Sequence, residues 1–296
     1  MAEFGAASEN EPIWWYETGT DDITLGLRMR LLHRERTPYQ LLEIYEHPFF
    51  GRVLVLDGNL QTTQGDEFIY HEMLTHVPLL GALPASMNDA SVLIIGGGDG
   101  GTLREVLRHD WVRRVVMVEI DQVVIERCRE FLGFNGNYDD PRVTLIIGDA
   151  AQYVAEEAAR QQPFDAILVD STDPVGPGEV LFTPEFIRNA WACLKPGGVF
   201  ARHLCMPLFD GPIVRDGVAR LRQVFPRVEV YQATIFTYVG AQMAFVACTK
   251  DGRSVREPQR LLTGRYYNPD VHRAAFALPT WWMTELIDAP AAEAGL

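Results

Sequence analysis

The chain has 296 residues, 47% of them hydrophobic, which is ample for a packed core and fits one large domain or two modest ones. Acidic residues (40 Asp and Glu) outnumber basic ones (26 Lys and Arg), and the formal charge of −14 argues against nucleic acid as a partner and favours small cations. No apolar run is long enough to span a membrane, and residues 1–10 lack the features of a secretory signal, so we expect a loose tail there.

The first third of the chain has the alternating pattern of β-strands. Alternation over residues 25–32 and 39–45 predicts two strands, and residues 52–63 predict a hairpin that turns at Asp57-Gly58-Asn59. A helical period follows at residues 68–77, before a cluster of Pro, Gly and Ser. We therefore expect a small antiparallel β domain over residues 1–78 and a larger domain over residues 79–296.

The larger part alternates strands and helices. Its apolar runs predict strands at residues 92–95, 115–119, 143–147, 166–170 and 199–203, with helices between them at residues 123–131, 150–160 and 184–194. This alternation predicts an α/β fold with a doubly wound parallel sheet, in which ligands bind beyond the carboxyl ends of the strands.

A glycine-rich turn, residues 96–101, follows the first of these strands. Its glycines satisfy the spacing of a dinucleotide site, which keeps NAD as an alternative: Gly96, Gly98 and Gly101. Asp99 favours another ligand, because a carboxylate repels pyrophosphate and suits a cation. Glu119 lies about 20 residues further on, where an acid commonly binds ribose hydroxyls. We therefore expect a nucleoside site of the S-adenosylmethionine type, with plain helix capping as the alternative role of Asp99.

Acidic residues follow four successive predicted strands: Asp99, Glu119, Asp149 and Asp170. Because the carboxyl ends of parallel strands meet at one edge of a sheet, we expect these side chains to share a site. Asp173 follows Asp170 in a loop with two prolines and two glycines, which suits a lid that closes over a substrate. An Asx turn followed by a helix cap is the alternative role of this acid pair.

Several stretches resemble the polyamine aminopropyltransferases, the spermidine synthases in particular: residues 56–73, 94–101, 118–121, 170–182 and 266–279. The resemblance implies a Rossmann-like domain of the S-adenosylmethionine-methyltransferase type behind the β domain, assembled as homodimers or homotetramers. It implies transfer of the aminopropyl group of decarboxylated S-adenosylmethionine to putrescine, which gives spermidine and methylthioadenosine. The donor is then a co-substrate, and no cofactor or metal is expected.

The resemblance also implies roles for single residues. Asp170 matches the catalytic acid/base, and Tyr70 matches a tyrosine beside the attacking nitrogen. The implied donor-binding residues are Gln40, His71, Gly96, Gly98, Asp99, Glu119, Asp149, Ala150 and Pro177. The implied acceptor-binding residues are Gln61, Asp173, His203 and Tyr238.

Two positions near the acceptor depart from the family's pattern. His203 stands where these enzymes usually carry glutamine, within a run (residues 202–206) that differs from the usual Gln-Asn-Gly-like sequence, and Phe236 replaces a usual proline. The acceptor therefore stays open among putrescine, agmatine, cadaverine and spermidine. A methyltransferase and a non-catalytic polyamine-binding protein remain as alternative functions.

The four cysteines are widely spaced and form no metal-type pair: Cys128, Cys193, Cys205 and Cys248. We expect a reduced, cytoplasmic protein with buried thiols.

Overall fold

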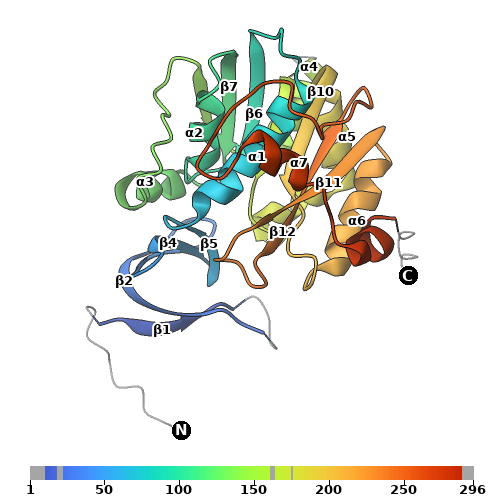
Figure 1. The fold of residues 1–296 in the computed structure, drawn as a ribbon. Coiled ribbons are helices and arrows are strands. Elements are labelled where there is room, and N and C mark those ends of the chain that lie inside the picture. Colours follow the sequence, from blue (N-terminus) through green and yellow to red (C-terminus); the bar gives the residue numbers. More distant parts are fainter. Residues whose placement is uncertain (1–10, 19–22, 161–163, 175, 289–296) are drawn as a thin grey trace.

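The computed structural model describes residues 11–18, 23–160, 164–174 and 176–288, which form two sheets joined by a helix (Figure 1). The expected loose tail lies outside the described residues. The N-terminal sheet is antiparallel, and its strands follow chain order: β1 Ile13–Tyr16, β2 Gly26–Arg36, β3 Leu41–His47, β4 Gly51–Leu56 and β5 Asn59–Thr63. The expected hairpin turns at Asp57 and Gly58, which both have positive φ (47° and 77°). The sequence pattern did not predict β1, because four residues are too few to show a clear alternation.

Helix α1, Glu67–Ala82, connects the two sheets. It extends five residues beyond the expected helix and passes through Pro78, so a division after residue 78 falls inside it. An interior proline removes a backbone hydrogen bond at a cost of about 3 kcal/mol. Burial of nearly every side chain along α1 offsets that cost here. The antiparallel sheet already ends at Thr63, and the division into two domains stays a prediction.

The second sheet has seven strands in the order β11-β12-β10-β9-β6-β7-β8. Their bounds are β6 Ala90–Gly96, β7 Val112–Glu119, β8 Val143–Ile147, β9 Phe164–Asp170, β10 Leu194–His203, β11 Arg227–Thr234 and β12 Gln242–Thr249. Five are parallel, from β10 to β8, as expected. β12 corrects the expectation of a wholly parallel sheet, because it pairs antiparallel with both β10 and β11. β6 and β9 are neighbours in the sheet. After β6 the chain adds β7 and β8 on one side, and after β9 it adds β10 on the other side. Such a switch point is where α/β folds bind ligands.

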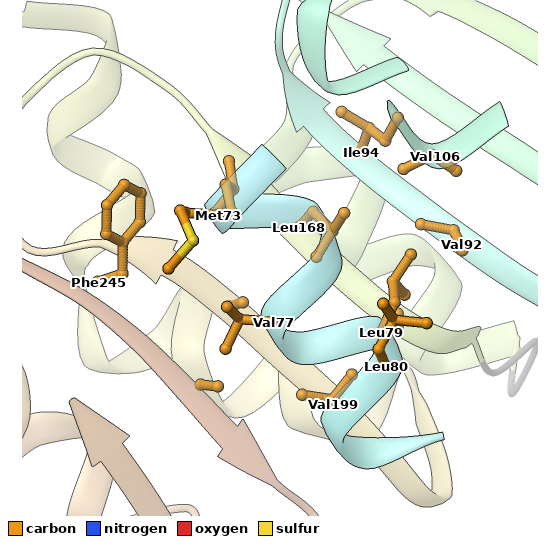
Figure 2. Packing of buried hydrophobic residues seen from close by; sticks show 14 of the residues in the cluster. Met73, Val77, Leu79, Leu80, Val92, Ile94, Val106, Leu168, Val199 and Phe245 are labelled. Atoms are coloured by element: carbon orange, nitrogen blue, oxygen red, sulfur yellow. The ribbon is translucent and has the colours of Figure 1, made fainter. Parts of the chain in front are cut away.

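Helices cover both faces of this sheet. One face carries α1 with α2, Gly101–Leu107, and the other carries α4, Ala150–Arg160, α5, Pro184–Ala192, and α6, Gly211–Arg222. α5 corrects the expected helix at 184–194, because β10 already begins at Leu194. Figure 2 shows the first core, in which side chains of α1 cluster with side chains of the sheet. Met73, Val77, Leu79 and Leu80 come from α1, Val92 and Ile94 from β6, Leu168 from β9, Val199 from β10 and Phe245 from β12.

Helix α3, Gln122–Phe131, joins the two parts of the molecule. Its Val124 and Cys128 pack in one buried cluster with Leu42 of β3 and Leu54 of β4. The N-terminal sheet is thereby held beside the carboxyl ends of the parallel strands, where it supplies one wall of a cavity. The remaining helices are a 3₁₀ helix, Gly176–Phe182, α7, Pro269–Ala274, and a π-helix, Trp282–Ile287. Among the described helices, none has the length and apolarity needed to cross a membrane.

Candidate active site

A cavity of about 310 Å³ lies at the carboxyl ends of β6, β7, β8 and β9, between them and the N-terminal sheet. Fourteen of the fifteen residues expected in the site line it: Gln40, Gln61, Tyr70, His71, Gly96, Gly98, Asp99, Glu119, Asp149, Ala150, Asp170, Asp173, His203 and Tyr238. The fifteenth, Pro177, lies in the 3₁₀ helix, and its side chain is outside the described part of the chain. Its neighbours Gly178, Val180 and Leu181 line the cavity. The fold therefore brings together residues more than 150 positions apart.

The glycine-rich turn is shaped by close approach of other groups. Gly96 has a φ of 76°, and a β-carbon on it would lie 2.1 Å from the carbonyl oxygen of Asp170. A β-carbon on Gly101 would lie 2.2 Å from the His71 ring. Glycine at these positions lets β6 and β9 end side by side and lets His71 reach Asp99.

Asp99 both caps the turn and faces the cavity. Its Oδ1 accepts a hydrogen bond from the Gly101 amide at 2.8 Å, and its Oδ2 lies 3.3 Å from His71 Nε2. The other ring nitrogen of His71, Nδ1, lies 2.6 Å from Glu67 Oε2, and Glu67 accepts two hydrogen bonds from Arg104. Burial works against a charged His71, yet Asp99 and Glu67 raise its pKa well above the usual value. The cap of the turn and the contact with His71 thus use different oxygens of Asp99, and its role in ligand binding stays a prediction.

Asp170 ends β9 with a side chain only 11% exposed. No described residue makes a hydrogen bond of normal geometry to its Oδ2, although the Thr102 and Tyr70 hydroxyls interact with the carboxyl group, and His71 Nε2 is 3.9 Å from Oδ2. Burial and the charge of Asp99 raise the pKa of Asp170, while the charge of His71 opposes that rise. A buried carboxylate with a free oxygen and a raised pKa suits proton acceptance.

A hydrogen-bonded row connects Tyr70 through His203 to Asp173. The Tyr70 hydroxyl lies 3.0 Å from His203 Nδ1, and His203 Nε2 lies 3.2 Å from Asp173 Oδ1. Asp173 is half exposed towards the cavity; desolvation by the surrounding wall works against its ionisation, but its hydrogen bond with His203 lowers the pKa of Asp173 overall. Burial, then the charge of Asp170, raises the pKa of Tyr70 well above 10, so its phenol stays protonated. His203 is therefore the link between the tyrosine and the acid.

Two other expected acceptor residues bond to backbone. The Tyr238 hydroxyl donates to the Gln61 carbonyl oxygen at 2.6 Å, and the Gln61 amide donates to the Asn59 carbonyl oxygen at 3.1 Å. The Tyr238 bond holds β5 against the loop between β11 and β12, whereas the Gln61–Asn59 bond lies within β5. Phe236, the other departure from the family's pattern, is 68% exposed and is not among the residues that line the cavity. The Phe236 side chain is therefore not part of the described cavity wall.

Glu119 lies at the opposite end of the cavity, at the end of β7. It accepts hydrogen bonds from the Gly98 amide at 3.1 Å and the Asp121 amide at 2.9 Å. Burial raises the pKa of Glu119 to about 7, although these amides oppose the rise. Gln40 donates to Asp121 Oδ2 at 3.1 Å, and the exposed Asp149 caps α4 by accepting from the Ala151 amide at 2.7 Å.

The raised pKa of Glu119 predicts a pH-dependent penalty on stability. Below pH ~4.3 the group is neutral in both states; as pH rises towards 7 the unfolded chain loses this proton first. Folding stability should fall over that range by at most about 3 kcal/mol. Thermal unfolding between pH 5 and 8 should show a smaller fall for Glu119→Gln than for the native chain. Glu126→Gln, on the exposed side of α3, should keep the native fall, and equal falls in all three proteins would contradict the prediction.

The structure adds two acids that line the cavity, and a thiol bonded to a third lining acid, which sequence reasoning missed. Glu17 follows β1, lines the cavity and accepts from the Leu60 amide at 3.0 Å. Burial raises the pKa of Glu17, the Leu60 amide opposes the rise, and the charge of Asp173 adds to it. Asp210 lines the same end, and Cys205 donates to Asp173 Oδ1 at 3.1 Å. The sequence offered a signal for Glu17, which is an acid directly after the aromatic residues Trp15 and Tyr16. It offered no signal for Cys205, because Asp173, the partner of Cys205, is 32 positions away.

Two known domain families match this chain. A spermine/spermidine synthase domain matches residues 67–258, and a spermidine synthase tetramerisation domain matches residues 13–64. A polyamine aminopropyltransferase of Salmonella newport is 43% identical over 283 residues, covering 92% of this chain and 96% of that protein. One from Pseudomonas syringae pv. tomato is 44% identical over 263 residues, covering 85% and 90%.

Solved structures agree in fold. A spermidine synthase in complex with the transition-state analogue AdoDATO has a TM-score of 0.85 at 37% identity, over 95% of this chain and 98% of that one. The spermidine synthase of Thermotoga maritima has a TM-score of 0.82 at 35% identity, over 95% and 97%. The likeness spans both sheets and the cavity between them.

Proposed function

This chain belongs to the spermine/spermidine synthase family of polyamine aminopropyltransferases, and from that premise we propose that it moves the aminopropyl group of decarboxylated S-adenosylmethionine to putrescine. The products are spermidine and methylthioadenosine. The donor is a co-substrate, and no further cofactor enters the proposal. We further propose a cytoplasmic homodimer or homotetramer, in line with the match to a tetramerisation domain and the four free cysteines.

The observation that carries the proposal is the charge of the cavity wall. Its described lining includes seven acidic residues and no lysine or arginine: Glu17, Asp99, Glu119, Asp149, Asp170, Asp173 and Asp210. The decarboxylated donor carries a sulfonium and an ammonium, and a diamine acceptor carries two ammonium groups. Such a wall attracts both molecules. It offers no lysine or arginine to the carboxylate of intact S-adenosylmethionine, which disfavours a methyltransferase.

In the proposed step the neutral nitrogen of the diamine attacks the methylene carbon next to the sulfonium. The new carbon–nitrogen bond forms as the carbon–sulfur bond breaks, and its electron pair neutralises the sulfur of methylthioadenosine. The attacking nitrogen gives its proton to the free Oδ2 of Asp170. No enzyme nucleophile is required, because the substrate supplies its own and the site only holds the two reactants in line.

The acceptor must lose a proton before it attacks. For an amine with a pKa of ~10.4, about one molecule in 2,500 is neutral at pH 7, and selecting it costs roughly 4–5 kcal/mol. The positive sulfonium next to the bound amine lowers the amine pKa by like-charge repulsion, and desolvation in the cavity adds to this. The pKa of Asp170 is raised, so the difference between the pKa of the amine and that of its proton acceptor becomes smaller.

The row of Tyr70, His203 and Asp173 positions the acceptor. With its hydroxyl proton directed to His203 Nδ1, the Tyr70 oxygen accepts from the attacking nitrogen, while His203 Nε2–H donates to Asp173. Asp173 then anchors the far ammonium group. A diamine, which has two nitrogens, can thus give one nitrogen to Asp170 and the other to Asp173, both of which line the cavity.

Product analysis by mass spectrometry tests the proposal. Purified protein receives decarboxylated or intact S-adenosylmethionine, with putrescine, cadaverine, agmatine or spermidine in parallel. Methylthioadenosine and spermidine, formed from the decarboxylated donor and fastest with putrescine, is the expected result. A faster reaction with another amine would change the acceptor. S-Adenosylhomocysteine from the intact donor would indicate a methyltransferase, and bound polyamine without turnover would indicate a binding protein.

His203→Ala should raise KM for the acceptor about 10-fold and leave KM for the donor unchanged. The substitution leaves the Tyr70 hydroxyl and Asp173 Oδ1 without this partner, a loss of about 1–3 kcal/mol. His203→Gln should restore much of the acceptor KM, because an amide also donates and accepts. Steady-state kinetics with each substrate varied in turn provides the measurement. An unchanged acceptor KM in His203→Ala would remove His203 from the acceptor site.

A further inference from the structure

We propose that Asp173, His203 and Cys205 form a binding site for a divalent transition-metal ion, with Zn²⁺ as the best match, and that the ion and the acceptor amine exclude each other. The exclusion rests on the proposed function, since it takes Asp173 as the anchor of the amine. The existence of the site rests on the geometry alone.

The three ligand atoms already lie almost where a metal requires them. His203 Nε2 and Cys205 Sγ lie 3.2 Å and 3.1 Å from Asp173 Oδ1, and the three atoms lie within 4.8 Å of one another. Tetrahedral zinc with bonds of 2.0–2.3 Å separates neighbouring ligand atoms by roughly 3.4–3.6 Å. Two of the three separations are therefore already close to those of a zinc site, and the third, between His203 Nε2 and Cys205 Sγ, does not exceed 4.8 Å.

The chemistry of the three groups also fits. A thiolate, a neutral imidazole and a carboxylate are common zinc ligands, and their two negative charges neutralise Zn²⁺. Cys205 loses its proton when the metal binds. A histidine that binds metal usually donates a hydrogen bond from its other ring nitrogen to a fixed partner. The Tyr70 hydroxyl, 3.0 Å from Nδ1 of His203, can be that partner. In the metal-bound form Nδ1 carries the proton, so the Tyr70–His203 hydrogen bond reverses direction.

The setting is pre-formed and open on one side. His203 and Cys205 are buried (4% and 1% exposed), whereas the Asp173 side chain is 51% exposed and gives the ion a way in. Cys205 has a φ of 64°, a left-handed conformation that a residue with a β-carbon rarely adopts, and the fold nevertheless holds its thiol against Asp173. Three protein ligands leave a fourth position for water, as in zinc sites that remain accessible.

A second cluster, His71, Asp99 and Asp170, provides the natural contrast. Its ligand atoms also lie within 4.8 Å of one another, but it contains no thiol and faces the proposed donor end. A metal there would compete with the donor. A metal at Cys205 would compete with the acceptor and would show a sulfur ligand.

Cobalt spectroscopy tests the site without turnover. Co²⁺ added to the intact protein should give the near-ultraviolet charge-transfer absorption of a thiolate–cobalt bond, and Zn²⁺ should abolish it. Cys205→Ser should lose this absorption, while Cys193→Ser, a matched change at another buried thiol, should keep it. Absence of the band from the native protein, or its persistence in Cys205→Ser, would overturn the proposal. Should Cys205→Ser not fold, His203→Gln should weaken cobalt binding in its place.

Inhibition by Zn²⁺ tests the exclusion. Zn²⁺ should inhibit competitively against putrescine and not against the donor. In Cys205→Ser the inhibition constant of Zn²⁺ should rise by at least about 10-fold to 100-fold, because loss of a residue that only hydrogen-bonds to a metal ligand already weakens metal binding by that much. The inhibition is measured against the variant's own rate without metal. Competition with the donor would assign the ion to the other cluster and overturn the exclusion. Cobalt binding through Cys205 in a protein without turnover would keep the site and reject the proposed function.

Discussion

Replacing Asp170 with asparagine should lower kcat by about 100-fold to 10,000-fold, the range that general-base groups contribute. The amide cannot accept the proton of the attacking amine, yet it has nearly the shape of the carboxylate. Binding of the donor, measured by calorimetry, should change little. Methylthioadenosine formation in a single turnover measures the chemical step directly.

The pH profile of kcat and the variant Asp173→Asn distinguish proton acceptance by Asp170 from a purely electrostatic effect of its negative charge. Because burial and Asp99 raise the pKa of Asp170, kcat of the native enzyme should fall as pH falls through a value above the ordinary ~3.9 of aspartate. That acidic limb should be absent from Asp170→Asn. Asp173→Asn should instead act chiefly on KM for the acceptor. Near-native turnover of Asp170→Asn would reject Asp170 as the base.

Replacing Asp99 with asparagine should lower kcat/KM for the decarboxylated donor by about 10-fold to 100-fold, since a hydrogen bond to a charged group contributes roughly 1.5–3 kcal/mol. Asparagine keeps an oxygen for the Gly101 amide, so the turn stays capped. It removes the negative charge that faces the cavity from Oδ2, 3.3 Å from His71 Nε2. The variant should therefore lose its attraction for the aminopropyl ammonium while it keeps its fold.

The ratio of the two donors provides an internal control for Asp99. Intact S-adenosylmethionine has a carboxylate that the native Asp99 repels, so its binding should improve or stay the same in Asp99→Asn. Calorimetry with each donor measures the ratio. An equal loss for both donors would mean that Asp99 acts only through the turn.

Local sequence patterns predicted most of the fold. The hairpin at Asp57-Gly58 follows from residues that tolerate positive φ, and the five parallel strands follow from short apolar runs between amphipathic helices. Long-range packing overrode the pattern elsewhere. The proline that suggested a break lies inside α1, because burial on all sides keeps that helix intact. The apolar patterns predicted neither β11 nor β12, and the antiparallel direction of β12 depends on its pairing with β10 and β11.

The sequence by itself determined the acids at the strand ends and the glycine turn, because parallel strands in one sheet present their carboxyl ends at one edge whatever else the chain does. Only the tertiary structure placed Glu17 in the cavity and connected Tyr70 through His203 to Asp173 and Cys205. These contacts join residues up to 133 positions apart, and no local spacing encodes them. The tertiary structure also decided the directions of the pKa shifts at His71, Glu119 and Asp170, because these groups become buried and gain their charged neighbours only on folding.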